Sequence, residues 1–140
     1  MRVPQSLQGS TCEDLSSRWQ LDPRLAVKLL LLENLWEWRF PRLGSLRIIS
    51  GWRSYEEQSE LAAEGRPAAA DELSTHRSCP ATGADIAFPI ATDDYTKLEF
   101  GQLVRQAGLR WGGGGPLDAR GLPIDWPHVD LGPRKRGVPQ

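Results

Sequence analysis

Hydrophobic side chains recur at helical spacing in one long stretch of the chain. The four clearest positions are Leu25, Leu29, Leu32 and Trp36. Residues three and four apart lie on one face of an α-helix, so this stripe is typical of a core helix. Asp22 followed by Pro23 supplies its start, because Asp caps free backbone N–H groups and Pro suits the first helical position. The pattern predicts a helix that begins at Pro23 and ends before Pro41.

Start and stop signals predict three further helices. Each begins at a Ser or Thr, the residue types that cap helices through their hydroxyl groups. Two of the starts also carry an acidic residue three positions later, which matches a capping box. The expected ranges are Thr11 to about Gln20, Ser54 to about Glu64 and Thr92 to about Ala107.

Short alternating or β-branched segments predict strands between these helices. The expected strands are Leu46–Ile49, Ala84–Phe88, Leu109–Trp111 and His128–Leu131. Gly112 to Gly115 should form a flexible or tightly turned loop without regular structure, and Gly65 to Leu73 a surface loop. Together these elements predict an α+β fold, with a small antiparallel sheet and flanking helices.

The length, composition and net charge are those of an ordinary globular protein. We expect it to be a monomer with one domain over residues 1–140. Of the 140 residues, 39% are hydrophobic and 25% charged, and the net charge is -1. This balance excludes a nucleic-acid binder that relies on a basic surface, and we interpret Arg134-Lys135-Arg136 as a solvated terminus. The longest apolar run, Leu29 to Leu32, is too short for membrane insertion. The N-terminal residues contain no apolar core segment, so we expect synthesis in the cytoplasm without a signal peptide.

Both histidines of the chain lie near an aspartate. His76 precedes Asp85 across a loop, and His128 follows Asp125 in the run Asp-Trp-Pro-His. Catalytic zinc takes three protein ligands from His, Asp, Glu and Cys. With two histidines, a carboxylate or a thiolate must supply the third ligand.

The segment before His128 suggests a catalytic group. Pro127 stiffens the chain, so that Asp125 and His128 can face one cleft while the acid stays too far back to be a ligand. A carboxylate in that place suits a general base that takes a proton from activated water. The alternative is that this segment forms an exposed turn without a function. Two segments that together contain both histidines of the chain favour a metal site instead.

Three segments together resemble the M15 family of zinc peptidases, which includes D-alanyl-D-alanine carboxypeptidases, dipeptidases and phage L-alanyl-D-glutamate endolysins. They are Ser50-Gly51-Trp52-Arg53-Ser54, Ser74-Thr75-His76 through Gly83-Ala84-Asp85, and Asp125-Trp126-Pro127-His128. The similarity covers residues from about 46 to 131, in the family's order. Trp111-Gly112-Gly113 also resembles the family's pattern. The resemblance implies the α+β fold shared by hedgehog proteins and D-Ala-D-Ala peptidases.

Carried over by position, the resemblance implies one zinc ion, with His76, Asp85 and His128 as its ligands. Asp125 would be the catalytic base. Arg53 would bind a substrate carboxylate or stabilise the oxyanion. Ser74 would donate a hydrogen bond near His76. Three tryptophans beside these motifs could line a substrate groove: Trp52, Trp111 and Trp126.

The spacing departs from the family at one place. Asp85 follows His76 by nine residues, two more than the family's usual spacing, and the extra length falls around Cys79. A loop absorbs two residues at little cost in free energy. Cys79 is nevertheless an alternative ligand that could replace Asp85.

The leading hypothesis is a zinc metallopeptidase that hydrolyses peptidoglycan stem peptides, as a D,D-carboxypeptidase or an L-Ala-D-Glu endopeptidase. We expect it to act at the cell wall or periplasm after release, as a phage lysis enzyme, or to be virion-associated. One alternative is a non-catalytic zinc-binding domain of the same fold that serves in structure or partner binding. A weaker one is an assembly protein with a tryptophan binding face.

Overall fold

The computed structural model describes residues 5–65, 74–77, 79–88 and 92–133. The C-terminal basic cluster and the predicted loop after Gly65 therefore lie outside the described residues. The helices are α1 (Cys12–Trp19), α2 (Pro23–Arg39), α3 (Tyr55–Ala63) and α4 (Asp94–Gln106). The strands are β1 (Gln5–Ser6), β2 (Arg47–Ser50), β3 (Gly83–Ala87), β4 (Arg110–Trp111) and β5 (His128–Asp130).

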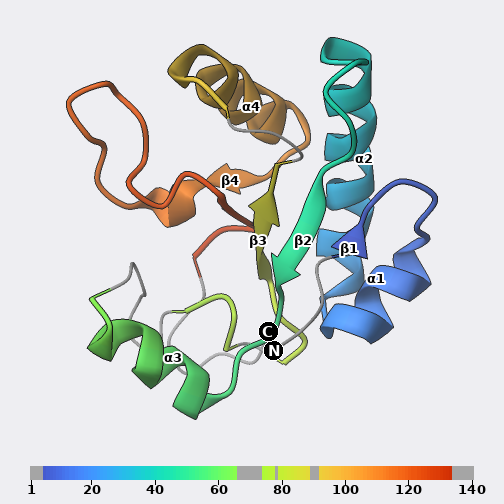
Figure 1. The fold of residues 1–140 in the computed structure, drawn as a ribbon. Coiled ribbons are helices and arrows are strands. Elements are labelled where there is room, and N and C mark those ends of the chain that lie inside the picture. The colour runs from blue at the N-terminus through green and yellow to red at the C-terminus, as the bar shows by residue number, and fades with distance from the viewer. Residues whose placement is uncertain (1–4, 66–73, 78, 89–91, 134–140) are drawn as a thin grey trace.

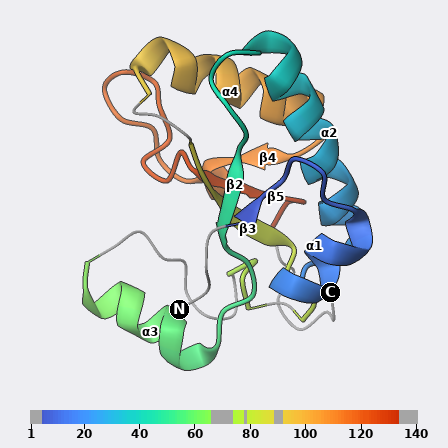
Figure 2. The same cartoon turned by 45° about the vertical axis from the view of Figure 1, so that its right-hand side comes forward.

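The strands form one antiparallel sheet in the order β1-β2-β3-β5-β4. The predicted α+β class, a small antiparallel sheet with flanking helices, is thus confirmed. In both views helices α1 and α2 lie together beside the sheet, whereas α3 stands apart from the other helices (Figure 1, Figure 2). Among the described helices, none has the length and apolar character needed to cross a membrane.

Local capping explains where the helices begin. Thr11 and Asp14 form the predicted capping box at α1. The side chain of Asp22 accepts a hydrogen bond from the backbone of Arg24 at the start of α2. The predicted cap of α4 was wrong by one residue, because Asp93, rather than Thr92, accepts the Thr96 N–H at 2.8 Å.

The glycine run also differs from the prediction of a loop without regular structure. Gly112–Gly114 forms a single 3-10 turn. Its three residues all have positive φ, between 66° and 70°, which glycine adopts without steric cost. The turn leads the chain from β4 into the loop that returns to β5.

The core lies between the helices and one face of the sheet. The predicted stripe on α2 is fully buried, with 0% exposure at Leu25, Leu29, Leu32 and Trp36. Ile48, Ile86 and Val129 from three adjacent strands belong to the same core. Burying one such side chain contributes about 1.5–3 kcal/mol, so this stripe is what fixes α2 against the sheet.

The opposite face of the sheet positions polar side chains in one row. Asp85 pairs with His128 on β5 and with Ser50 on β2, across a register shift between Ile48 and Ser50. Because side chains alternate between faces along a strand, Asp85 points away from the core while Ile86 points into it. The row crosses three neighbouring strands at one level.

Candidate metal centre

Three side chains bring their donor atoms together above this row. His76 Nε2 lies 3.1 Å from His128 Nδ1 and 3.4 Å from Asp85 Oδ1. His128 Nδ1 lies 3.2 Å from Asp85 Oδ1. The two histidines are 3% and 6% exposed, so solvent contributes little to this cluster. The group could hold a metal ion, and it consists of the three residues that the sequence predicted as ligands.

The spacing of these atoms fits a zinc ion. With metal–ligand distances of about 2.0–2.2 Å and tetrahedral angles, two ligand atoms lie about 3.3 Å apart. The three observed distances, 3.1, 3.2 and 3.4 Å, bracket that value. Two imidazole nitrogens and one carboxylate also form a donor set typical of catalytic zinc, which keeps a fourth position open.

His76 is oriented by a backbone carbonyl. Its Nδ1 lies 2.6 Å from the carbonyl oxygen of Gly51, and a carbonyl can only accept, so Nδ1 carries the proton. The lone pair then resides on Nε2, which faces the cluster. Glycine is needed at position 51 for a separate reason, because a Cβ there would lie 2.4 Å from the Trp19 carbonyl oxygen.

His128 is oriented in the same way by a carboxylate. Its Nε2 lies 2.7 Å from Oδ2 of Asp130, which is 0% exposed. Asp130 in turn accepts two hydrogen bonds from Arg110, at 2.8 and 2.9 Å, and one from the Gly132 N–H at 2.8 Å. With its N–H directed at Asp130, His128 presents the Nδ1 lone pair to the cluster.

These contacts leave three electron-pair donors facing one another, an arrangement that needs a cation between them. The electrostatics agree. Burial alone would lower the pKa of His128, but Asp130 and Asp85 outweigh it and raise that pKa to about 9. Burial would likewise raise the pKa of Asp85, but His76 and His128 hold it well below its usual value. The cluster attracts either a proton or a metal ion.

Asp130 is a residue that the sequence argument missed. The alternation His128-Val129-Asp130 was visible, and it places Asp130 on the same strand face as His128. Burial alone would raise the pKa of Asp130, but His128 and Arg110 outweigh it and lower that pKa. The signal that could have found it is an acid at alternate spacing from a proposed ligand.

Arg53, predicted to bind a substrate carboxylate or to stabilise the oxyanion, contacts the carboxylate of the centre itself. Its guanidinium forms an ion pair with Oδ2 of Asp85 through Nη2, and its Nε donates to Ser50 Oγ at 3.2 Å. The Arg53 side chain is only 11% exposed. In this arrangement Arg53 fixes the carboxylate of Asp85, which leaves Oδ1 directed at the two histidines.

Asp125 lies beside the cluster without bonding to it. The structure gives its half-buried carboxylate no hydrogen bond or ion pair within the described residues, although the fields of His128, His76 and Arg53 reach it. Burial raises the pKa of Asp125, and the charge of Asp85 raises it further, while these three groups oppose the shift. A carboxylate with a raised pKa and no fixed partner is suited to accept and return a proton.

The loop that carries Asp125 is held at three points. The His128 N–H donates to the Asp125 carbonyl at 3.0 Å, and the Ile86 N–H donates to the Pro127 carbonyl at 3.0 Å. Trp111 Nε1 donates to the Trp126 carbonyl at 2.7 Å. Trp111 is only 8% exposed and belongs to the core, which corrects the prediction that it lines a groove. Its buried indole anchors the loop to the core through this hydrogen bond.

The segment before β3 supports the histidines. Ser74 Oγ accepts a hydrogen bond from the His76 backbone N–H at 3.3 Å, so in this contact Ser74 is an acceptor rather than the predicted donor. Thr75 Oγ1 lies 3.3 Å from His128 Nε2. Gly83 is required beneath them, because a Cβ there would lie 2.0 Å from Thr75 Oγ1 and 2.9 Å from His128 Cε1.

The remaining predicted residues fall at the edges of the centre. Cys79 is exposed and lies outside the group of converging donor atoms. Trp52 is half-buried, with the Arg77 guanidinium 6.0 Å from its ring centroid. Trp126 is half-buried and lines a pocket next to the centre.

The comparisons with known proteins show the fold. No protein-family model matches the chain, and no curated protein matches it. Among solved structures, the chain is similar to the L-Ala D-Glu endopeptidase ChiX of Serratia marcescens, with 19% sequence identity and a TM-score of 0.52. The match covers 79% of this chain and 80% of that one. Most of the chain thus adopts the fold of that endopeptidase.

Proposed function

We propose that this protein is a zinc-dependent peptidase that hydrolyses peptide bonds in peptidoglycan stem peptides. One observation carries the proposal: His76 Nε2, His128 Nδ1 and Asp85 Oδ1 converge at ligand spacing beside Asp125, whose carboxylate has no hydrogen bond to the residues that the structure describes. The resemblance of the three motifs to M15 peptidases supports it, and so does the shared fold with ChiX. The L-Ala–D-Glu bond, for which that neighbour is named, is the first bond to test.

Each residue has a defined task under this proposal. His76, Asp85 and His128 hold the metal, which when bound supplies a Lewis acid that activates water at neutral pH. Asp125 accepts a proton at its carboxylate as water attacks, and then returns it to the leaving amine. Arg53 holds the Asp85 carboxylate in position through their ion pair. Asp130 and the Gly51 carbonyl keep the two imidazoles in the tautomers that bind metal.

The direct test pairs metal content with peptide release. Purified protein should contain about one zinc ion per chain and release peptides from purified peptidoglycan. Asp125→Ala should retain zinc and lose activity by about 10²–10⁴-fold, which is the usual contribution of a general base. Asp94→Ala removes an exposed carboxylate that pairs with Arg120 on the surface, so this control should stay active.

Two outcomes would contradict the proposal in different ways. Zinc binding without hydrolysis in the wild type would support the non-catalytic zinc-binding alternative. Equal activity of wild type and Asp125→Ala would leave a peptidase but remove Asp125 from its mechanism. Action at the cell wall, as a lysis or virion-associated enzyme, is part of the same proposal.

A further inference from the structure

The face of the sheet that carries the metal centre continues past Asp85 along β3. Side chains two positions apart on a strand share one face, and residues directly opposite each other on neighbouring strands share it too. Ala87 follows Asp85 by two positions, and Arg47 on β2 is paired with Ala87. Arg47 therefore lies on the same face as Asp85, whereas its neighbour Ile48 is paired with Ile86 and buried in the core.

Arg47 lies close enough to the centre to contact a ligand bound there. Ala87 is about 7 Å from Asp85 along β3, and the step across to Arg47 is about 5 Å, so the Arg47 backbone lies about 9 Å from that of Asp85. One residue of an extended peptide spans about 3.3–3.6 Å. A ligand residue next to the centre is therefore within reach of the long Arg47 side chain.

Arg47 differs in its partners from Arg53 and Arg110, which lie at the same face. Arg53 forms an ion pair with Asp85, and Arg110 donates two hydrogen bonds to Asp130. Both of these guanidinium groups are thus engaged by carboxylates of the protein. Arg47 is exposed, and its side chain has no hydrogen bond, ion pair or ring contact with the residues that the structure describes. Its charge is available to an anion that binds from solvent.

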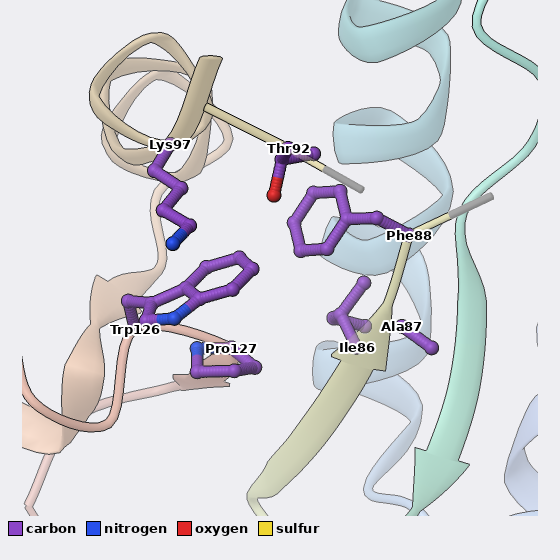
Figure 3. Close-up of a pocket in the computed structure, with 7 residues that line it drawn as sticks. All are labelled: Ile86, Ala87, Phe88, Thr92, Lys97, Trp126 and Pro127. Carbon is purple, nitrogen blue, oxygen red and sulfur yellow. The ribbon is translucent and has the colours of Figure 1, made fainter. Parts of the chain in front are cut away.

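The cation of the neighbouring pocket lies on the other side of β3. Figure 3 shows Lys97 beside the ring of Trp126 in this pocket of about 390 Å³. Its wall includes Phe88 and the core residue Ile86, and none of the three converging residues lines it. Lys97 is therefore separated from the metal centre by the strand, whereas Arg47 is not.

We propose that Arg47 binds the free carboxylate of the acidic residue next to the bond that is cut, and so selects acidic stem peptides. For an L-Ala–D-Glu bond that residue is D-glutamate. A guanidinium forms two parallel hydrogen bonds with a carboxylate, which suits this task. The inference rests on the proposed function, because it takes a stem peptide as the ligand. It assigns to Arg47 the carboxylate binding that the resemblance implied for Arg53.

Two synthetic stem peptides test the inference. One carries the free carboxylate of D-glutamate, and the other carries a primary carboxamide in its place. Dissociation constants are measured by calorimetry on zinc-loaded Asp125→Ala protein, in which the peptides stay intact under the proposed mechanism. We expect the carboxylate peptide to bind about 10-fold more tightly, as one charge-assisted contact gives. Equal binding of the two peptides, or binding of neither, would overturn the inference.

Variants of Arg47 in the same background identify the cation. Arg47→Met should abolish the preference and leave the affinity for the carboxamide peptide unchanged, because methionine keeps an apolar side chain and removes the charge. Arg47→Lys should retain a smaller preference, since lysine keeps the charge without the planar fork. Arg24→Met is the matched control and should have no effect, because this 68% exposed side chain lies on α2, which packs against the other face of the sheet.

The zinc content of each variant verifies that the centre is intact. A carboxylate preference that survives Arg47→Met would assign the contact to another cation and overturn the inference. An equal loss of affinity for both peptides in Arg47→Met would also overturn it, because the effect would then not concern the carboxylate.

Hydrolysis by the wild type separates this inference from the proposed function. A carboxylate preference that depends on Arg47, without cleavage of either peptide, would overturn the peptidase and leave the binding assignment standing. Cleavage of both peptides with equal kcat/KM, unaffected by Arg47→Met, would do the reverse.

Discussion

Nε2 of His128 lies 2.7 Å from the carboxylate of Asp130, two residues further along the same strand. Both residues are buried, with exposures of 6% for His128 and 0% for Asp130. Since the contact fixes which nitrogen of His128 carries the proton, it also fixes which nitrogen can bind a metal. Asp130, which is not one of the three converging residues, thus decides which nitrogen of His128 is available to a metal.

Asp130→Asn should therefore weaken zinc binding without removing a ligand. We expect the affinity to fall about 10–100-fold, the usual effect of losing a group that orients a metal-binding histidine. A competition titration with a zinc chelator measures it, with Asp94→Asn as a surface control and circular dichroism to verify folding. An unchanged affinity would show that Asp130 does not hold the tautomer.

A pair of variants distinguishes the two candidates for the third ligand. Asp85→Asn should lower zinc affinity by more than about 100-fold, because it removes the anionic ligand itself. Cys79→Ser should leave the affinity at the wild-type value, since Cys79 is exposed and outside the group. The same chelator titration serves both variants. A large loss of zinc in Cys79→Ser would reverse the ligand assignment.

Gly83→Ala tests the close packing under the histidines. The added Cβ would meet Thr75 Oγ1 at 2.0 Å and the Thr75 Cβ at 2.8 Å. Because backbone or Thr75 must shift, we expect a loss of about 1–3 kcal/mol in the free energy of unfolding, together with weaker zinc binding. Urea denaturation measures the first effect. Gly115→Ala, whose Cβ would meet its nearest atom at 3.5 Å, should be close to neutral.

Glu33 should make the stability depend on pH. This carboxylate is 4% exposed and accepts the Leu46 N–H at 3.0 Å. Burial, reinforced by Glu37, raises its pKa from 4.5 to about 7. Folding then favours the protonated form, so the contribution of Glu33 is fully present below pH 4.5 and is lost as the pH rises through 7.

Glu33→Gln should remove this slope, because Gln keeps an acceptor for the Leu46 N–H but does not ionise. At pH 8 the variant should be more stable than wild type by up to about 3 kcal/mol. Urea denaturation across pH 4.5–8 measures the difference, and the exposed Glu60→Gln serves as the control. Parallel stability curves for Glu33→Gln and wild type would contradict the assignment.

The local part of the fold could be predicted from the sequence. The stripe from Leu25 to Trp36 and the capping pairs are signals between residues close in the chain, and the structure contains the helices that they predict. The brief strand β1 was missed, because Gln5–Ser6 carries no apolar alternation and exists through pairing with Ile48 and Arg47. Strand pairing of this kind depends on a partner over forty positions away.

The candidate site was predictable in its residue types and less so in its contacts. His76 and His128 could be chosen because the chain has 2 histidines, whereas Asp85, one of 18 acidic residues, was chosen through the resemblance of its motif to M15 peptidases. The partners of Arg53 and Asp130 could not be chosen, since their contacts depend on the register between β2, β3 and β5. Trp111 shows the same limit, because the sequence does not reveal that Gly101 leaves the space its ring fills.

The space left by Gly101 brings helix α4 into contact with the ring of Trp111, which lies on strand β4. Helix α4 carries both this glycine, against which Trp111 packs, and Lys97, which lies over Trp126. The converging donor atoms come instead from the segment before β3 and from β3 and β5. Residues along the first turns of α4 can therefore be exchanged in evolution while the converging donor atoms on the sheet stay in place.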